Sequence, residues 1–403
     1  MKTDRIVFWQ PTPSPHQSSY LRSLANLLPL TNVVGVFEHS IPEPRRDLGW
    51  SLPNFGRIQL VLAPDKEQIL QLLRESPEST MHVLSGLRSP MIREVFAMVA
   101  PTQSVIGVLS EGRDRRGVLG YIRRLHSLFL EDGYRNRVDF VLAMGNLGVH
   151  WFENCGYNKD RIFHWGYFVE PIGSTDSLAT GDSDKVNLAY VGQLIPRKGV
   201  DILLRALAQV NRSNWKLQVV GRGKSAVSLR QLSTQLGIDK RVTYIDALPN
   251  SLVREIFRKV DFFVLPSRFD GWGAVVNEAL MAGTPVVCTD HCGAATLVES
   301  SGYGKVAKAE SVESLSDSLR AMIDLGPLPL TARNAIRDWA RCIGGERAAE
   351  FFLEIIRYCE KGGEKPVAPW LRSNGPVDFT QNSFPANLKA IQKSNSSTKT
   401  PFS

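Results

Sequence analysis

The chain has 403 residues, of which 43% are apolar and 22% charged, a balance typical of globular proteins and long enough for two domains. No apolar run approaches the roughly 20 residues that span a bilayer, and the N-terminus has no secretory signal pattern, so we expect a cytoplasmic location. The formal charge of +8 favours an acidic partner, either nucleotide phosphates or an anionic membrane, and no motif for nucleic acid is present.

Buried-strand patterns alternate with amphipathic helical patterns through the first half of the chain. The strand patterns cover 5–9, 32–38, 57–62, 81–85, 104–109 and 140–144, and the helical patterns cover 18–28, 66–74 and 92–99. This alternation predicts a parallel sheet with helices on both faces, in which ligands bind beyond the carboxyl ends of the strands. We predict a Rossmann-like domain over residues 1–178.

Polar side chains follow two of these predicted strands. A proline-rich loop after the first strand carries His16 and Gln17, and Glu111 follows the strand at 104–109. Their place after strand ends makes them candidates for binding a ligand, although His16 is equally well explained as the neighbour of a helix cap.

A basic segment follows Glu111 and leads into a predicted helix. Apolar side chains recur there at helical spacing, and arginines lie elsewhere on the surface: Val118, Ile122, Leu125 and Phe129, with Arg113, Arg116 and Arg123. A solvated basic face is the ordinary explanation. The alternative is an interfacial helix on anionic lipid, where each basic residue contributes about 1 kcal/mol.

Residues 174–184 are polar and rich in turn residues, which indicates an interdomain linker. A second alternation then begins. Its strand patterns cover 186–191, 216–220, 242–245, 261–265, 284–288 and 304–307, and its helical patterns cover 200–210, 226–236, 251–260, 274–281 and 312–323. These patterns predict a second Rossmann-like domain over residues 179–340.

The first strand of this second domain runs into a loop with glycine and two cations. Gly192 and Gln193 come first, and Arg197 and Lys198 come directly before a predicted helix. Free backbone amides, positive charge and a helix N-terminus together suit a diphosphate. A surface basic pair is the alternative.

Residues 220–226 read G-x-G-x-x-A through Gly221 and Gly223, with Asp246 about 20 residues further on, which is typical of a dinucleotide-binding turn. Such a turn belongs after the first strand of a domain, whereas this one follows the second. An oxidoreductase is therefore kept as an alternative.

The stretch 266–290 combines a glycine-rich turn with a helix that is apolar on nearly every face. Asn277 and Glu278 are the polar residues of that helix, and a carboxylate in such surroundings needs hydrogen-bond donors. Asp270 lies eight positions before Glu278, in the turn. A ligand able to reach the backbone of the turn would also meet the first amides of the helix.

The spacing of these residues resembles the signature of family 4 of the retaining glycosyltransferases, also called group 1, which have the GT-B fold. The matching positions are Asp270, Gly271, Trp272, Gly273, Glu278, Ala279, Gly283, Pro285, Val286 and Val287. The first acid is usually Glu in the family and is Asp270 here. The resemblance implies two Rossmann-like domains that face each other across a cleft.

The resemblance also implies roles for these residues. Glu278 would hold the ribose of a nucleotide sugar, Asp270 and the following amides would bind the donor sugar, and the two cations would neutralise the diphosphate. Gln193 stands where the family usually has Arg. The predicted catalytic residues are Asp270, Glu278, Arg197 and Lys198; the predicted donor-binding residues are Gly192, Gln193, Gly221, Gly223, Asp270, Gly271, Trp272, Gly273 and Glu278; the acceptor-side candidates are His16, Gln17 and Glu111.

The predicted function is transfer of a sugar from a UDP- or GDP-linked donor to a glycan or lipid-linked glycan, with retention and without a metal ion or separate cofactor. Cell-surface polysaccharide synthesis and peripheral contact with an anionic membrane are implied by the resemblance. A non-catalytic nucleotide-sugar-binding homologue and an NAD(P)-dependent oxidoreductase are the alternatives.

The five cysteines lack the spacing of a metal site or of a disulfide framework. Cys288 and Cys292 flank His291, which a metal would also suit, but incidental thiols in a reducing compartment are the interpretation we favour. The resemblance implies a final helix, 341–361, that crosses back to the first domain. Residues 362–403 are polar and aperiodic, and we expect most of this tail to be disordered.

Overall fold

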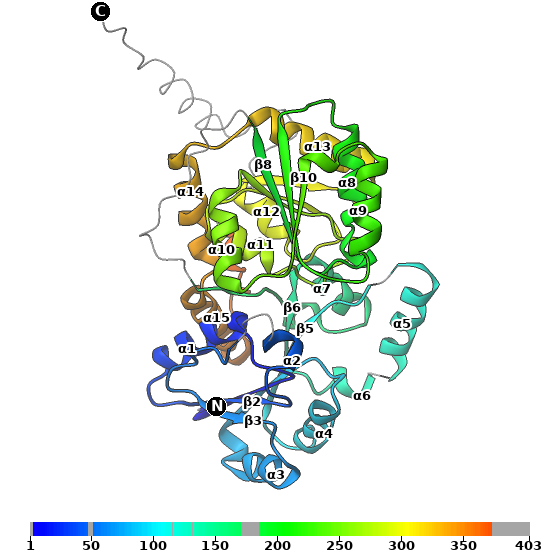
Figure 1. The fold of residues 1–403 in the computed structure, drawn as a ribbon. Helices are drawn as coiled ribbons and strands as arrows, with labels where there is room; N and C mark the ends of the chain where they lie inside the picture. The colour runs from blue at the N-terminus through cyan, green and yellow to red at the C-terminus, as the bar shows by residue number, and fades with distance from the viewer. Residues whose placement is uncertain (1–2, 47–50, 115, 131, 171–184, 373–403) are drawn as a thin grey trace, which may run out of the picture. The chain divides into compact units, whose positions relative to one another are not determined.

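The computed structural model describes residues 3–46, 51–114, 116–130, 132–170 and 185–372 (Figure 1). These residues divide into two α/β units. The N-terminal unit contains the described residues up to 170 together with 342–369, and the C-terminal unit contains 185–341 together with 370–372. The linker predicted over 174–184 and the part of the predicted tail beyond residue 372 lie outside the described residues.

Seven parallel strands form the sheet of the N-terminal unit, in the order β3-β2-β1-β4-β5-β6-β7. The strands are β1 (Arg5–Gln10), β2 (Asn32–Phe37), β3 (Gln59–Leu62), β4 (Thr80–Ser85), β5 (Val105–Glu111), β6 (Phe140–Met144) and β7 (Ile162–Trp165). Strand β1 is buried along its whole length because it is central in a sheet that helices cover on both faces.

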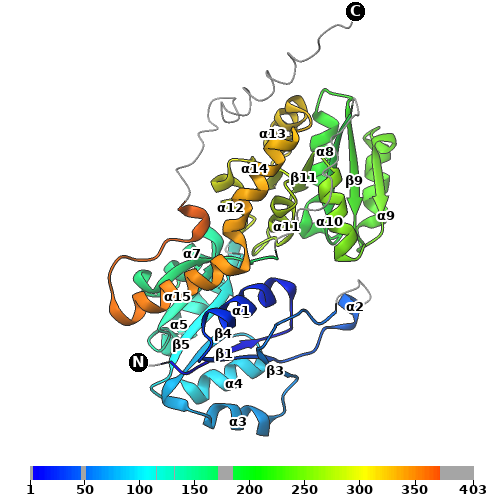
Figure 2. The same cartoon turned by 90° about the vertical axis from the view of Figure 1, so that its left-hand side faces the viewer.

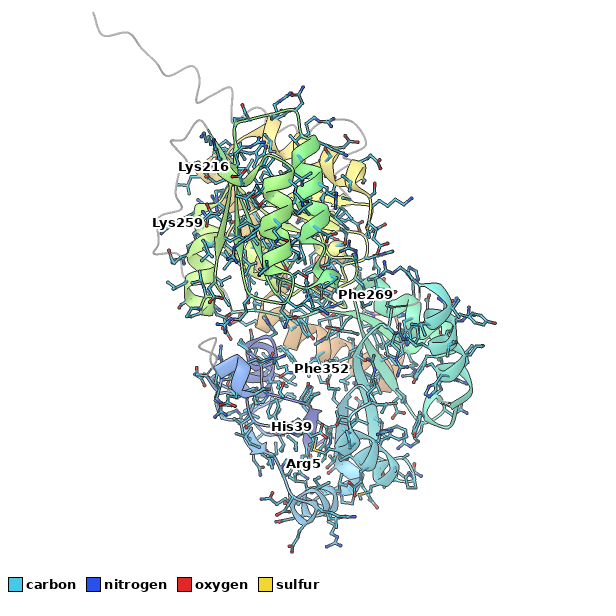
Figure 3. All side chains as sticks on the ribbon, turned by 45° about the vertical axis from the view of Figure 1, so that its right-hand side comes forward. Arg5, His39, Lys216, Lys259, Phe269 and Phe352 are labelled. Atoms are coloured by element: carbon cyan, nitrogen blue, oxygen red, sulfur yellow. The ribbon has the colours of Figure 1, made fainter. Side chains whose placement is uncertain are left out.

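Three helices of this unit begin at a side chain that caps them, namely Ser14, Asp65 and Ser89. Ser14 accepts a hydrogen bond from the amide of His16 at the start of the first helix, which has proline in its first turn. The helices are α1 (Pro15–Leu27), α2 (Glu43–Arg46), α3 (Lys66–Arg74), α4 (Pro90–Val99), α5 (Gly117–Leu130), α6 (Asp132–Arg135), α7 (Gly145–Asn154) and α15 (Gly345–Lys361). Helix α15 packs on α1 and places Phe352 in the core, with its ring 5.7 Å from that of Phe8 (Figure 3).

Six parallel strands form the sheet of the C-terminal unit, in the order β10-β9-β8-β11-β12-β13. The strands are β8 (Val186–Val191), β9 (Trp215–Val220), β10 (Val242–Ile245), β11 (Phe262–Leu265), β12 (Val286–Thr289) and β13 (Gly304–Ala307). Strands β11 and β12 are fully buried, which explains their unbroken apolar sequences.

Helices cover both faces of this second sheet. They are α8 (Val200–Gln209), α9 (Ala226–Gln235), α10 (Asn250–Lys259), α11 (Val275–Met281), α12 (Ala295–Ser301), α13 (Val312–Leu325) and α14 (Leu330–Ala340). Helices α8, α9 and α13 pack together on one face, and α10, α11, α12 and α14 pack together on the other (Figures 1 and 2).

Both sheets share one winding pattern. In each, the first strand lies between the second and the fourth, so the chain winds outward from the centre in both directions. The loops after the first and fourth strands diverge at this switch point, and ligands of doubly wound sheets bind there. In the C-terminal unit these are the loops after β8 and β11, and in the N-terminal unit they are the loops after β1 and β4.

The prediction of two doubly wound α/β domains is confirmed. The sequence interpretation missed β7, a four-residue strand whose apolar run is too short to distinguish from a loop. The final helix predicted over 341–361 corresponds to α15, which begins at Gly345 after a short 3₁₀ turn at Arg341–Ile343.

No helix within the described residues combines the length and the apolar character that crossing a bilayer requires.

Candidate functional site

The loops after β8 and β11 are joined by an arginine at the switch point of the C-terminal unit. Arg268 makes a bidentate ion pair with Asp201 in the first turn of α8, with nitrogen–oxygen distances of 2.8 and 2.7 Å. Its backbone amide donates to the carbonyl of Arg197 at 2.9 Å. These bonds hold the two loops in register, although their residues lie about 70 positions apart in the sequence.

Three of the four predicted catalytic residues meet between these loops. The Nζ of Lys198 lies 2.5 Å from Oδ2 of Asp270, and Nη1 of Arg197 lies 3.7 Å from Oδ1. The Lys198 and Asp270 side chains are only 14% and 12% exposed, whereas that of Arg197 is 46% exposed. One carboxylate therefore faces two cations, which leaves an excess of positive charge at the switch point.

A third loop fixes the backbone around Asp270. The Asp270 amide donates to the carbonyl of His291 at 2.9 Å, and the Gly293 amide donates back to the carbonyl of Asp270 at 3.0 Å. A Cβ at position 293 would lie 2.1 Å from the carbonyl oxygen of Gly271, so only glycine fits. The sequence interpretation considered this loop only as an alternative metal site, through Cys288, His291 and Cys292, and gave Gly293 no role.

The side chain of Trp272 faces the interior. It is 1% exposed, donates from Nε1 to Oδ1 of Asn277 at 2.8 Å, and packs against Trp370, which is also buried. Its backbone carbonyl accepts from the amide of Ala294 at 2.8 Å. Trp272 therefore holds the turn in place.

The backbone of the same turn provides donors. Among the described residues, no acceptor is found for the amides of Gly271, Gly273, Ala274 and Val275, which lead into α11. These groups are the ones that the predicted sugar-binding role would use. The arrangement suits a ligand rich in hydroxyl or phosphate oxygens.

Glu278 lies in the first turn of α11, in an apolar environment. Burial raises the pKa of its carboxyl to about 7, and the nearby Arg254 guanidinium opposes that rise. Within the described part of the chain, its carboxylate makes no hydrogen bond or ion pair. A partly buried carboxylate of this kind is typical of a functional site, because ligand donors can satisfy it.

The glycines of the loops after β8 and β9 allow two backbones to approach closely. A Cβ at Gly221 would lie 1.9 Å from the carbonyl oxygen of Gly192, and one at Gly223 would lie 2.4 Å from that of Leu194. Gly221 also has a φ of +145°, which favours glycine. This packing accounts for the G-x-G-x-x-A pattern without a dinucleotide, and the turn lies after the second strand of the sheet rather than at the switch point.

Tyr190 stabilises the loop after β8 through a hydrogen bond. Its hydroxyl donates to the backbone carbonyl of Gln193 at 2.8 Å, while the side chain of Gln193 lies on the exposed side of the loop. Burial raises the pKa of the Tyr190 hydroxyl, and the Asp270 carboxylate adds to that rise. The sequence interpretation missed this residue because its position inside a strand gave no signal of a polar role.

The acceptor-side candidates of the N-terminal unit are linked by a tyrosine. The rings of His16 and Tyr167 stack with centroids 5.4 Å apart and 21° between their planes. The hydroxyl of Tyr167 donates to Oε1 of Glu111 at 2.9 Å. Gln17 points elsewhere, because its Nε2 donates to Oε1 of Gln10 at 2.8 Å. His16 and Glu111 are thus brought together, although they lie on different loops.

Glu111 also lines a pocket at the carboxyl ends of β4 and β5. Ser110, Arg88 and Arg113 contribute polar atoms to this pocket, and Trp151 forms part of its wall. The guanidinium of Arg113 lies 5.9 Å from the centre of the Trp151 ring. Charged groups above an aromatic wall are a combination that suits the polar edges and apolar faces of a sugar ring.

Cys292 stabilises the turn that contains Trp272. The Cys292 thiol donates to the carbonyl of Trp272 at 2.9 Å. A hydrogen bond donated to Cys292, together with burial, raises the pKa of the Cys288 thiol well above its usual value. In the part of the chain that the structure describes, no group of three or more His, Cys, Asp and Glu side chains is placed to hold a metal ion.

The amino-acid sequence of the C-terminal unit has identifiable relatives. Residues 179–339 match the family model described as "Glycosyl transferases group 1". This segment is therefore similar to group 1 glycosyl transferase domains. The matched segment contains every candidate site residue of the C-terminal unit, whereas His16, Gln17 and Glu111 lie outside it.

Curated relatives align with about two fifths of the chain. A D-inositol 3-phosphate glycosyltransferase from Nocardia farcinica is 31% identical over 179 residues, which are 41% of this chain and 39% of the relative. An uncharacterised glycosyltransferase from Methanocaldococcus jannaschii is 29% identical over 171 residues, 42% of this chain and 44% of the relative. The chain thus spans less than half the length of these relatives.

Solved structures resemble the chain over most of its length. The lipopolysaccharide outer core galactosyltransferase WaaB in its apo form has a TM-score of 0.65 at 16% identity, covering 87% of this chain and 99% of WaaB. HepE from Anabaena, in complex with UDP-glucose, has a TM-score of 0.61 at 14% identity, covering 87% of this chain and 99% of HepE. At these identities the likeness shows the fold, and the GT-B fold class predicted from the sequence is confirmed.

Proposed function

We propose that this protein is a glycosyltransferase that moves a sugar from a nucleotide-diphosphate-sugar donor to a hydroxyl of a glycan or lipid-linked glycan. The observation that carries the proposal is the arrangement of Lys198, Arg197 and Asp270 beside backbone amides that have no acceptor among the described residues, at the switch point of the unit that matches the group 1 family. Cations and amides at this position suit a diphosphate, and a carboxylate beside them suits sugar hydroxyls.

Each side chain has a role that follows from its contacts. Lys198 and Arg197 stabilise the negative charge that develops on the diphosphate as the bond to the sugar breaks. Asp270 orients Lys198 before the donor binds and accepts hydrogen bonds from the sugar. Glu278, whose carboxylate makes no hydrogen bond in the described chain, accepts hydrogen bonds from the ribose hydroxyls.

The donor we propose is linked to UDP, and GDP is the second candidate. Support for UDP comes from HepE, a GT-B neighbour whose structures contain UDP and UDP-glucose. The two cations at the site take the place of a divalent metal in this proposal, and the nucleotide sugar is a substrate rather than a cofactor. Retention at the anomeric carbon is the stereochemical outcome we expect.

The acceptor is bound by the N-terminal unit in this proposal, at the pocket beside Glu111. Its charged groups and aromatic wall favour a sugar. The names of the neighbours WaaB and WaaG refer to lipopolysaccharide, which supports a role in cell-surface polysaccharide synthesis on the cytoplasmic side of a membrane.

A binding and turnover experiment tests the proposal. Purified protein is mixed with UDP, GDP, ADP, their sugar conjugates, NAD and NADP, each with and without EDTA. A nucleotide at 100 times its Kd stabilises the fold by about 2.7 kcal/mol, which a thermal-shift measurement detects. We expect UDP and one UDP-sugar to raise the Tm equally with and without EDTA, and we expect release of UDP from that donor when an acceptor glycan is added.

The variant Glu278→Gln should lose the shift caused by UDP, whereas the exposed control Glu313→Gln should retain it. A UDP shift without turnover against a range of glycans would indicate the non-catalytic homologue. A shift with NAD or NADP alone would reject the transferase in favour of an oxidoreductase.

A further inference from the structure

The ionic contact at the C-terminal site depends on a short side chain. Aspartate carries its carboxylate one methylene nearer to the backbone than glutamate does, yet Oδ2 of Asp270 lies 2.5 Å from Nζ of Lys198. The two residues lie on different loops, after β11 and after β8. Their contact therefore requires the backbones of these loops to lie close together.

The two loops do touch through their backbones. Gly199 has a φ of +67°, and a Cβ at this position would lie 2.0 Å from the carbonyl oxygen of Pro266. Nη1 of Arg197 donates to the carbonyl of Phe269 at 2.9 Å, and Phe269 is labelled in Figure 3. The carboxylate and the amine can meet because the loops themselves are in contact.

Arg268 joins the loops through one guanidinium group. Besides its bidentate pair with Asp201, it donates to the carbonyl of Pro196. Its Nε also lies 4.0 Å from Oε1 of Glu310, in the loop after β13. The Arg268 side chain is 28% exposed, and a planar fork that binds a carboxylate with two bonds fixes geometry as well as charge. The group thus ties the loop after β11 to two of its neighbours.

The backbone of Glu310 supports a role for this arginine in the site. The φ of Glu310 is +61°, one of three positive φ values at residues other than glycine in the described chain. Such a conformation is unfavourable and persists where the surrounding contacts require it. Here it places a carboxylate beside the guanidinium that joins the loops.

We propose that Arg268 is a positioning residue, which holds the loop after β11 against the loop after β8 so that the short carboxylate of Asp270 reaches Lys198. Without the bidentate fork the loops separate, and the amine is no longer oriented before the donor binds. The expected effect on sugar transfer rests on the proposed function. The contact between the two side chains can be measured without turnover.

A second ion pair of the same unit provides a matched control. Arg212 binds Asp324 with nitrogen–oxygen distances of 2.7 and 3.3 Å. Arg212 precedes β9, so this pair lies at the edge of the sheet where the strands begin, away from the switch point. It joins the same residue types without contact to the site, and its loss measures what an ion pair contributes to stability alone.

Acetylation of Lys198 tests the contact in the full chain without ligand. Acetic anhydride modifies accessible amines, and mass spectrometry gives the rate at Lys198 relative to the exposed Lys216. The Lys198 side chain is 14% exposed and paired, so its rate should be low in the wild type. Arg268→Lys keeps the charge and the backbone bonds but loses the fork, and should raise the rate at least about tenfold. Asp201→Asn should have the same effect, and Arg212→Lys should have none.

A longer carboxylate tests whether Arg268 acts through Asp270. Arg268→Lys should lower kcat at least about tenfold, and Arg268→Lys/Asp270→Glu should recover at least about threefold, because the added methylene spans part of the gap. Asp270→Glu alone should lower kcat, since the longer side chain does not fit between loops that the fork holds together. Arg212→Lys should lower the urea midpoint as much as Arg268→Lys does and retain normal kcat.

Three results would overturn the inference. They are an unchanged acetylation rate at Lys198 in Arg268→Lys, a normal kcat in that variant, and a double variant whose loss is the product of the two single losses. A wild-type chain that transfers no sugar from any donor would reject the proposed function alone, because the acetylation rates still decide whether Arg268 maintains the contact.

Discussion

The two units share a strand order and differ in what their loops carry. In each sheet the first strand lies beside the fourth, so each has a switch point where loops diverge. In the C-terminal unit the loops there carry cations and a carboxylate in direct contact, with distances of 2.5 and 3.7 Å. In the N-terminal unit, the polar side chains at the same edge of the sheet are connected through stacked rings and one hydroxyl–carboxylate bond.

This difference teaches that the scaffold fixes where ligands bind and the loop residues fix which ligands bind. Positive charge and free amides in one unit suit a phosphate-bearing donor, whereas His16, Tyr167 and Glu111 in the other suit a neutral, hydroxyl-rich molecule. Substitutions in one unit should therefore affect the use of the donor, and those in the other should affect the use of the acceptor.

The largest effect is expected at Lys198. Lys198→Ala leaves Asp270 without its close ion pair and removes a cation that would face the diphosphate, so kcat should fall at least about 100-fold. The control Lys216→Ala removes an exposed lysine of the same unit (Figure 3) and should retain full activity. Initial rates at saturating donor measure the effect, and a Lys198→Ala enzyme with normal kcat would exclude this role.

A large effect on stability is expected at Gly221. A Cβ there would overlap the carbonyl oxygen of Gly192, so Gly221→Ala should lower the free energy of unfolding by about 2–4 kcal/mol. Gly237 also has a positive φ but open space around it, so Gly237→Ala should cost only about 1 kcal/mol. Urea unfolding measures the free energy of unfolding of both variants. Equal losses would mean that the close approach of the loops after β8 and β9 does not contribute to stability.

A moderate effect on acceptor use is expected at Tyr167. Tyr167→Phe keeps the ring that stacks on His16 but removes the hydrogen bond to Glu111, so the KM for the acceptor should rise about tenfold. The Kd of UDP should not change, because the proposed donor site lies in the other unit. A change in UDP affinity instead would contradict the separation of roles.

A pH dependence of the stability is expected from Glu278. Its pKa of about 7 in the folded protein lies above the ordinary value of 4.5, so the folded chain keeps a proton that the unfolded chain has lost between these pH values. Stability from this group is present below pH 4.5 and is lost as the pH rises through 7. At about 1.4 kcal/mol per pKa unit, Glu278→Gln should thus be more stable than the wild type at pH 8 by about 3 kcal/mol and nearly equal to it at pH 4.5. Denaturant midpoints of both proteins at pH 4.5 and pH 8 measure the difference in stability. The same difference at both pH values would contradict a raised pKa of Glu278.

Much of the fold could be predicted because its signals are local. Strands such as β6 and β8 were predicted with the bounds that the structure shows, since a strand buried on both faces requires an unbroken apolar run. The turn that contains Asp270 and the helix that contains Glu278 were also visible, from glycine spacing and from a helix without a polar face. Strand β7 was missed because four apolar residues do not distinguish a strand from a buried loop.

The sequence by itself determined the alternation of strands and helices, the two sheets, and which loops carry charge, because each depends on residues a few positions apart. Only the tertiary structure decided which of those loops meet. The partners Lys198 and Asp270 are 72 positions apart, and Tyr167 and Glu111 are 56 apart. The first pair exists because the strand order makes neighbours of β8 and β11, which are not consecutive in the chain, and the second pair joins the ends of β5 and β7 across β6. Periodicity within one segment carries no information about either contact.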